Sequence, residues 1–273
     1  MKVGYLGPIG TYCYMACKNY VKENDEIIPF RNIQETINNV ITKYVDKCVV
    51  PLENSIEGSV SETLGVILDN QDLKIEGEIV IKVNHAIVSK EKVDLKDVKT
   101  VYSHPQALAQ CRKFILNNMP NAVIEATKST AEAATKVKEL PYTVAISNDI
   151  TAEIYNLEIL KRDVQDEINN QTKFIILSCK EQQQGWNKKV SIVFSTLNKP
   201  GELYKILGLF NIFDINLTKI ESRPARTTIG EYIFWIDFDT NQNEDNINIL
   251  LNQIKKRCSH FRILGTYERV INN

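Results

Sequence analysis

The chain has 273 residues, of which 43% are hydrophobic, and this length allows two or three domains with substantial cores. Its 33 Lys and Arg residues nearly balance its 34 Asp and Glu residues, so the charge favours neither a nucleic-acid partner nor an anionic membrane surface. No apolar run approaches the length of a signal-peptide core or a membrane span, and we expect a soluble protein of the cytosol.

The cysteines and histidines do not form a metal-binding pattern. The six cysteines are scattered without paired spacing, and only Cys13 and Cys17 could share a helix face. Three histidines give a zinc or iron site little to build on. The sequence therefore predicts reduced thiols, no metal and no cofactor.

Residues 1–178 alternate short apolar runs with helical patterns, which is typical of α/β folds with mostly parallel sheets. The expected strands cover 3–6, 48–52, 98–102, 122–125 and 143–147, and helical spacing marks 108–116 and 131–138.

Two apolar runs predict strands that cross between two lobes. The run 73–89 would leave the first lobe as one long strand, and 173–179 would return the chain to it. We expect a catalytic domain over 1–180 with a cleft between lobes of about 1–78 plus 165–180, and 79–164, as in periplasmic binding proteins.

The polar residues 180–187 predict a linker to a second domain, 188–273. Val190, Ile192 and Phe194 alternate with serines as in a strand, and a helix follows Gly201. The further apolar patterns complete the order strand, helix, strand, strand, helix, strand. This is the ferredoxin-like pattern, βαββαβ.

The segment Gly7-Pro-Ile-Gly-Thr11 follows the first expected strand and opens a helix. Its backbone amides, with those at the helix start, would form a seat for an anion, and Gly10 and Thr11 are the candidate binding residues. The alternative is an ordinary turn that uses glycine for its backbone freedom.

Polar side chains replace apolar ones in Pro51-Leu-Glu-Asn-Ser-Ile-Glu-Gly-Ser-Val60, where a buried strand should pass into a helix. Asn54, Ser55 and Glu57 are the candidate cleft residues of this segment. The alternative is that Ser55 or Ser59 only caps the next helix.

The segment Ser103-His-Pro-Gln-Ala-Leu-Ala-Gln-Cys111 again marks a strand that gives way to a helix. Ser103 can cap that helix, and Gln106 and Gln110 share one of its faces. Ser103 and His104 are neighbours on extended backbone and point apart, which argues against a nucleophile and its base.

These segments, with Asn169-Asn-Gln-Thr-Lys-Phe174, resemble in order the cleft motifs of prephenate dehydratases. The pattern ENSxEGxV is complete, and NxTRF is matched except that Lys173 replaces Arg. Other departures are Ile9 for Glu, Asn84 where a second His is frequent, and Glu202 for Ala. The resemblance covers essentially the whole chain, and Glu221-Ser-Arg-Pro224 resembles the signature of phenylalanine-sensing ACT domains.

The resemblance implies conversion of prephenate to phenylpyruvate, water and CO2 in phenylalanine biosynthesis, inhibited by L-phenylalanine. It implies a homodimer or homotetramer formed through the ACT domain. It makes Thr172 the general acid, although threonine at the start of a strand is commonplace. The catalytic set is Thr172, Asn54, Ser103 and Gln110. The substrate-binding set is Gly10, Thr11, Ser55, Glu57, Lys173 and Phe174. The phenylalanine-binding set is Gly201, Glu202, Leu203, Asn216, Leu217 and Thr218.

Two alternatives remain open from the sequence. An arogenate dehydratase would share the fold and the chemistry but take an amino acid as its substrate. A non-catalytic sensor of amino acids would use the same two-lobed cleft for binding alone.

Overall fold

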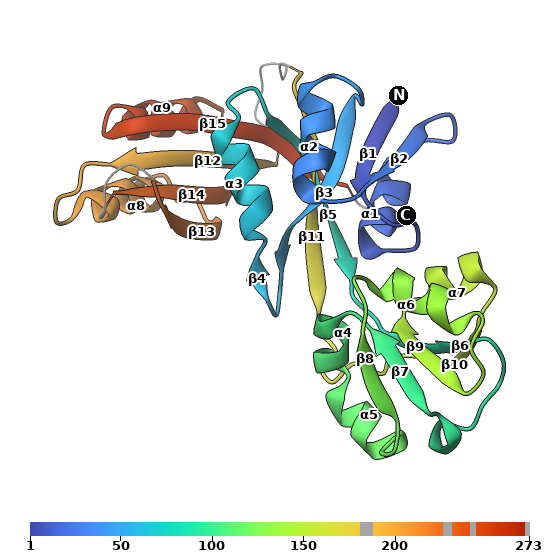
Figure 1. Ribbon diagram of the computed structural model, residues 1–273. Coiled ribbons are helices and arrows are strands. Elements are labelled where there is room, and N and C mark those ends of the chain that lie inside the picture. Colours follow the sequence, from blue (N-terminus) through green and yellow to red (C-terminus); the bar gives the residue numbers. More distant parts are fainter. Residues whose placement is uncertain (181–187, 226–230, 241–243, 271–273) are drawn as a thin grey trace. The chain divides into compact units, whose positions relative to one another are not determined.

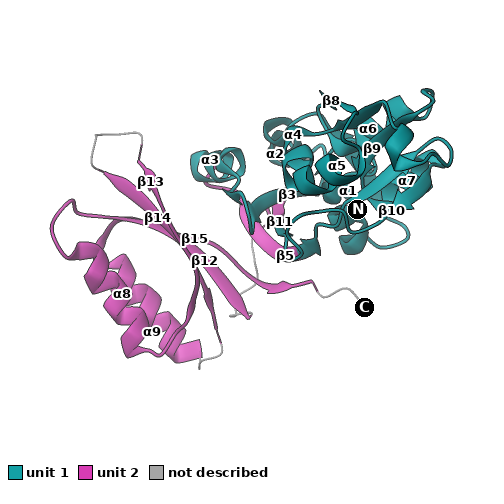
Figure 2. Ribbon diagram, turned by 90° about the horizontal axis from the view of Figure 1, so that it is seen from below, with its two compact units in different colours: residues 1–69, 80–174 teal, residues 70–79, 175–273 magenta. Residues whose placement is uncertain are grey.

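The computed structural model describes residues 1–180, 188–225, 231–240 and 244–270. They fall into two compact units: residues 1–69 with 80–174, and residues 70–79 with 175–273 (Figure 2). The predicted linker lies outside the described residues, except for Lys180. No helix in the described ranges is long and apolar enough to cross a membrane.

The first lobe of the first unit contains a parallel sheet in the order β2–β1–β3 (Figure 1). Its strands are β1 (Lys2–Leu6), β2 (Glu26–Phe30) and β3 (Lys47–Asn54), and its helices are α1 (Tyr12–Tyr20), α2 (Ile33–Ile41) and α3 (Ser61–Asp69). Thr11 and Asn32 cap the first two helices, each accepting a backbone N–H. The predicted strands at 3–6 and 48–52 are confirmed.

A short hairpin follows β3, where the sequence predicted direct passage into a helix. The two-residue strand β4 (Gly58–Ser59) pairs with Glu53 and Asn54 of β3 in antiparallel fashion. Asn54 fixes the turn, because its Oδ1 accepts the backbone N–H groups of Ile56 and Glu57 at 3.0 and 3.1 Å. The helix α3 begins only after this hairpin.

The second lobe contains a five-stranded sheet in the order β10–β6–β9–β7–β8. Its strands are β6 (Ala86–Ser89), β7 (Thr100–Ser103), β8 (Val123–Ala126), β9 (Thr143–Ser147) and β10 (Glu158–Lys161). Its helices are α4 (Pro105–Gln110), α5 (Arg112–Asn118), α6 (Thr130–Val137) and α7 (Asp149–Tyr155), with a 3₁₀ turn at Leu95–Asp97. The predicted strands are confirmed within about two residues, and the predicted helix over 108–116 is divided at Cys111.

The segments that connect the two lobes hydrogen-bond to each other. The prediction of one strand over 73–89 is wrong, because β5 (Lys74–Lys82) ends before β6 begins. The backbone N–H of Val83 donates to the Asn170 carbonyl at 2.9 Å, and that of His85 donates to Gln165 Oε1, also at 2.9 Å. Residues 83–85, between the two strands, belong to neither strand and are held by these bonds. The predicted return strand is confirmed as β11 (Gln171–Ser178).

The second unit has the predicted ferredoxin-like order of elements. These are β12 (Lys189–Thr196), α8 (Glu202–Ile212), β13 (Leu217–Pro224), β14 (Tyr232–Asp239), α9 (Glu244–Lys255) and β15 (Cys258–Arg269). The strands pair antiparallel in the order β13–β14–β12–β15. The helices bury Ile206, Phe210, Ile247, Leu250, Leu251 and Ile254 against the strands. The predicted fold class is thereby confirmed for this unit.

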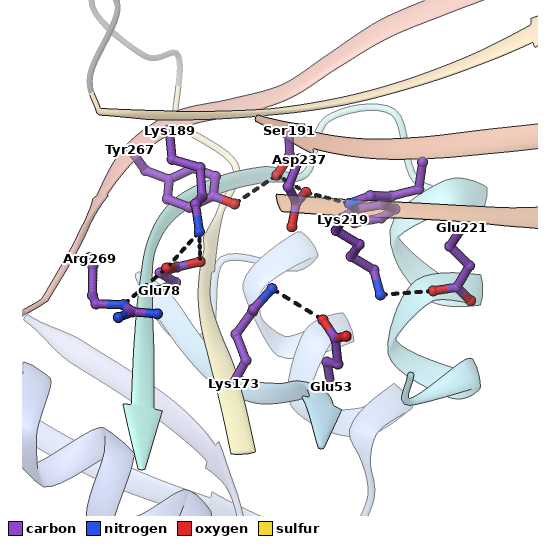
Figure 3. A network of polar contacts seen from close by, with 11 residues as sticks. Glu53, Glu78, Lys173, Lys189, Ser191, Lys219, Glu221, Asp237, Tyr267 and Arg269 are labelled. Atoms are coloured by element: carbon purple, nitrogen blue, oxygen red, sulfur yellow. Dashed lines mark hydrogen bonds and ion pairs between the residues drawn. The ribbon is translucent and has the colours of Figure 1, made fainter. Parts of the chain in front are cut away.

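A buried polar cluster lies on the other face of this sheet, the face that carries Ser191 of β12 (Figure 3). Ser191 Oγ donates to Asp237 Oδ1 at 2.6 Å and lies 2.7 Å from the Tyr267 hydroxyl. Trp235 Nε1 donates to the same carboxylate oxygen at 2.7 Å. Burial raises the pKa of Tyr267. The neighbouring Asp237 carboxylate acts in the same direction.

An ion cluster ties β5 to the C-terminal strand within the second unit. Gly77 and Glu78 pair in parallel with Glu268 and Arg269 of β15. The Glu78 carboxylate, 1% exposed, lies 2.9 Å from Lys189 Nζ and 3.2 Å from Arg269 Nε (Figure 3). Two cations thus compensate a carboxylate that burial would otherwise penalise.

Candidate active site

A cavity of about 1080 Å³ lies in the first unit and is lined from both lobes. The first lobe contributes the turn after β1 and the start of α1, and the second contributes the starts of α4 and α6. The connecting segments contribute His85, Asn170, Thr172 and Phe174. The predicted cleft thus contains residues that are remote from one another in the sequence.

The hydroxyl of Thr172 accepts a hydrogen bond at this cavity. Asn54 Nδ2 lies 2.9 Å from Thr172 Oγ1, 2.7 Å from Asn170 Oδ1 and 3.2 Å from the Gln171 carbonyl. Because Thr172 Oγ1 accepts from Asn54, its own proton can be donated to another group. Thr172 and Phe174 both line the cavity, as expected for alternate residues of one strand.

Amide side chains extend this network to the second lobe. Asn170, which is 1% exposed, donates from Nδ2 to Gln110 Oε1 at 2.9 Å. The same Gln110 oxygen lies 3.0 Å from His85 Nε2. Gln110 Nε2 is buried and has no partner among the described residues. Asn54 and Gln110, predicted as catalytic, are thus linked through Asn170.

Two residues that sequence reasoning did not select, His85 and Tyr12, complete the network. His85 Nδ1 lies 3.5 Å from the Tyr12 hydroxyl, which donates to the Asn84 carbonyl. Burial lowers the pKa of His85, and the hydrogen bond to Gln110 acts against it. His85 is therefore neutral at pH 7. The one sequence signal for His85 is the resemblance, because the family frequently has two histidines where this chain has Asn84 and His85.

Groups that can bind carboxylates surround the cavity. The helices α1 and α6 both begin there, with Thr11 and Ser129 as their N-caps. Arg31 of the first lobe and Lys128 of the second also line it, and both are exposed. Sequence reasoning missed these two cations. Arg31 directly follows β2, the kind of position where α/β sheets bind ligands.

Lys173 does not line the cavity. It lies between Thr172 and Phe174 on β11, so its side chain points to the opposite face. There its Nζ lies 3.1 Å from Glu53 Oε2, and its side chain is 15% exposed (Figure 3). The structure thus separates this cation from the Thr172 hydroxyl, and we do not retain it as a substrate ligand.

Four other predicted residues also lie away from the cavity lining. Ser103 is buried and donates to the Ile146 carbonyl at 2.7 Å, and His104, rather than Ser103, caps α4. Ser55 accepts the Gln171 N–H at 2.9 Å, which holds the segment before Thr172. Glu57 is exposed.

Gly10, the fourth of these residues, is buried and has a φ of 87°, a conformation that favours glycine. Its carbonyl accepts hydrogen bonds from Asn148 Nδ2 at 2.9 Å and Thr151 Oγ1 at 2.7 Å. Gly10 thus joins the turn of the first lobe to the start of α7 in the second. Thr11 is the member of the predicted anion seat that lines the cavity.

The second unit has a smaller cavity of about 290 Å³. Gly201, Glu202 and Leu203 line it, together with Leu197, Tyr232 and Phe234 among others. Gly201 has a φ of 82° and forms the N-cap of α8. Asn216 and Thr218 are exposed, and Leu217 packs against the core. The structure thus brings half of the predicted phenylalanine set together.

The described residues hold no group of three or more His, Cys, Asp or Glu side chains able to bind a metal ion. None of the six cysteines, all of which lie in the described ranges, forms a disulfide, and four of them are buried. Burial raises the pKa of Cys17 to about 12 and that of Cys111 to about 12, so both are protonated at pH 7.

Comparison with known proteins identifies the family. The family model described as prephenate dehydratase matches residues 3–182. The prephenate dehydratase of Methanocaldococcus jannaschii is 39% identical, over 96% of this chain and 96% of its own length. A bifunctional chorismate mutase/prephenate dehydratase of Aquifex aeolicus is 35% identical, over 99% of this chain and 74% of its own length.

A solved structure agrees with these sequence relatives. The crystal structure of prephenate dehydratase from Arthrobacter aurescens in complex with L-Phe has a TM-score of 0.88 and 30% identity. The match covers 100% of this chain and 92% of that one. With its two-lobed cavity and matching motifs, the chain belongs to the prephenate dehydratase family of enzymes.

Proposed function

We propose that the Thr172 cavity binds prephenate and converts it to phenylpyruvate, CO2 and water. The observation that carries this proposal is the 2.9 Å hydrogen bond from Asn54 to Thr172 Oγ1. This bond occupies a lone pair of the hydroxyl and leaves its proton available at the cavity. A donor at this point can serve the departing hydroxyl group of the substrate.

The reaction breaks two bonds and makes the ring aromatic. The bond between the ring and its carboxylate breaks, and its electron pair enters the ring as CO2 leaves. The bond between the ring and its hydroxyl oxygen breaks at the same time, and Thr172 gives the leaving oxygen a proton to form water. Threonine is too weak an acid to ionise beforehand, so proton transfer is concerted with cleavage, and solvent later restores the hydroxyl proton.

The two substrate carboxylates need different surroundings. An ion pair to the carboxylate that leaves would stabilise a charge that the reaction removes. We therefore assign the pyruvyl carboxylate to Arg31, Lys128 and the helix starts at Thr11 and Ser129, which line the cavity. Apolar groups such as Phe174 suit the carboxylate that leaves.

One assay tests the substrate. Purified protein is incubated with prephenate or with arogenate, and phenylpyruvate and phenylalanine are quantified. We expect phenylpyruvate from prephenate. Phenylalanine from arogenate, with no turnover of prephenate, would replace this proposal by arogenate dehydratase activity.

We further propose that the ferredoxin-like unit is an ACT domain that binds L-phenylalanine and inhibits the enzyme. The Arthrobacter relative is described in complex with L-Phe, and a cavity of about 290 Å³ here includes Gly201, Glu202 and Leu203. Asn216, Leu217 and Thr218 would complete the site from a second copy of the chain. This assigns the protein a homodimer or homotetramer, in the cytosol.

Calorimetry with L-phenylalanine, together with inhibition of prephenate turnover, tests the regulatory part. Coupling of this kind is typically worth about 1–3 kcal/mol, or 5- to 150-fold in affinity. Absence of binding by the full-length protein would refute the sensor role and leave the catalytic assignment in place.

A further inference from the structure

The hydrogen-bond network beside Thr172 has a fixed direction, set at one end by backbone amides. Asn54 Oδ1 accepts the N–H groups of Ile56 and Glu57, which can only donate. The oxygen and nitrogen of the Asn54 amide therefore cannot be exchanged, and Nδ2 must face Asn170. The atom of Asn170 that lies 2.7 Å from this nitrogen must be an acceptor, Oδ1.

The same reasoning continues to the second lobe. Since Asn170 Oδ1 faces Asn54, its Nδ2 donates to Gln110, and the Gln110 atom at 2.9 Å must be Oε1. His85 Nε2 lies 3.0 Å from that same oxygen and must carry a proton to bond with it. The backbone amides of residues 56 and 57 thereby specify the protonated nitrogen of a histidine in the other lobe.

We propose that His85 is a positioning residue, held as the Nε2–H tautomer, which with Asn170 fixes the Gln110 amide so that its NH2 group is reserved for an oxygen of the substrate. Two donors hold Gln110 Oε1, and Gln110 Nε2 is buried without a partner among the described residues. A buried amide donor that forms no hydrogen bond is unfavourable, and Gln110 lines the cavity. An acceptor such as a keto or carboxylate oxygen satisfies this nitrogen, whereas an ammonium group does not.

His85 is suited to this task by its surroundings. It is 3% exposed, and the Gln110 oxygen at its Nε2 is a strong acceptor. Its Nδ1 lies 3.5 Å from the Tyr12 hydroxyl, whose proton is donated to Asn84, so in this tautomer that contact is not a hydrogen bond. The neutral Nε2–H form meets the demand of the network without bringing a charge into a buried position. The inference rests on the proposed role of the Thr172 cavity, because positioning has a kinetic effect only if substrate binds there.

Nuclear magnetic resonance tests the tautomer directly in the full-length protein. The chain has three histidines, and the His85→Gln variant identifies the His85 signals by their loss. At pH 7.5 the imidazole ¹⁵N shifts should show a protonated Nε2 and an unprotonated Nδ1. An Nδ1–H tautomer, or a doubly protonated ring, would overturn the inference whatever the activity of the protein.

Kinetics test the consequence. His85→Leu removes the donor, and we expect kcat with prephenate to fall about tenfold, the value of one hydrogen bond of about 1.4 kcal/mol. His85→Gln can place an N–H group near the same point and should stay within about threefold of wild type. His260→Leu, at an exposed position of β15, is the matched control.

Comparison of the two His85 variants distinguishes a role in positioning Gln110 from a role in stability. Equal losses in His85→Leu and His85→Gln, or an unchanged kcat in His85→Leu, would contradict positioning. If His85→Leu does not fold, the tautomer in the natural protein still decides the question. Absence of turnover by the natural protein with either prephenate or arogenate would refute the proposed function, while the spectroscopic result remains valid.

Discussion

Removing the Thr172 hydroxyl is the sharpest perturbation of the proposed mechanism. In Thr172→Val the side chain keeps its branched shape, and in Thr172→Ala it is reduced to a methyl group. Both variants lose the donor to the departing hydroxyl group of the substrate. General acid catalysis contributes about 10²–10⁴-fold, so the barrier should rise by about 3–5 kcal/mol.

The structure predicts that this loss of activity is not a loss of folding. Asn54 Nδ2 keeps two other acceptors, Asn170 Oδ1 at 2.7 Å and the Gln171 carbonyl at 3.2 Å. The change therefore leaves the Asn54 donor paired, so the free energy of unfolding should fall by less than about 1.5 kcal/mol, the value of one ordinary hydrogen bond. Activity and stability should therefore change by very different amounts.

Steady-state production of phenylpyruvate from prephenate measures kcat and KM, and urea unfolding measures stability in the same samples. We expect kcat to fall 10²–10⁴-fold, as for the loss of general acid catalysis, with a smaller change in KM. Thr172→Ser retains a hydroxyl and should be more active than Thr172→Ala. Near wild-type kcat in Thr172→Val, or a loss explained by unfolding, would refute Thr172 as the acid.

Three further outcomes are expected. Lys173→Ala should leave KM for prephenate within about threefold, because this side chain lies on the strand face away from the cavity; a tenfold rise would restore Lys173 as a carboxylate ligand. Glu78→Ala should lower the free energy of unfolding by about 3 kcal/mol in urea titrations, because it leaves Lys189, 13% exposed, without its carboxylate. An unchanged unfolding midpoint in Glu78→Ala would contradict a stabilising role of the Glu78 carboxylate. Gly201→Val should weaken calorimetric binding of L-phenylalanine at least tenfold, because its φ of 82° disfavours a branched side chain. Gly208→Ala in the same helix, where an added methyl group meets nothing within 4 Å, is its control, and equal affinity in both variants would argue against this site.

Much of the architecture follows from short-range patterns. The α/β order, the two crossings and the ferredoxin-like unit are readable because strands and helices place apolar residues at different periods. The single strand expected over 73–89 is wrong because β5 and β6 belong to different sheets, and the residues between them hydrogen-bond to the segment that returns from the second lobe. No local property of the apolar run contains that information.

The sequence by itself predicted a cleft built from the segments 7–11, 51–60, 103–111 and 169–174, and their motifs made Thr172 and Asn54 candidate catalytic residues. Tertiary structure decided which side chains of those segments face inward. Thr172 and Lys173 are neighbours, but successive side chains of β11 point to opposite faces of the strand. Thr172 therefore lines the cavity, and Lys173 pairs with Glu53. His85 acquires its place only from contacts with residues far away in the chain. Its tautomer follows from two backbone amides in the other lobe, because hydrogen-bond direction passes from group to group through space.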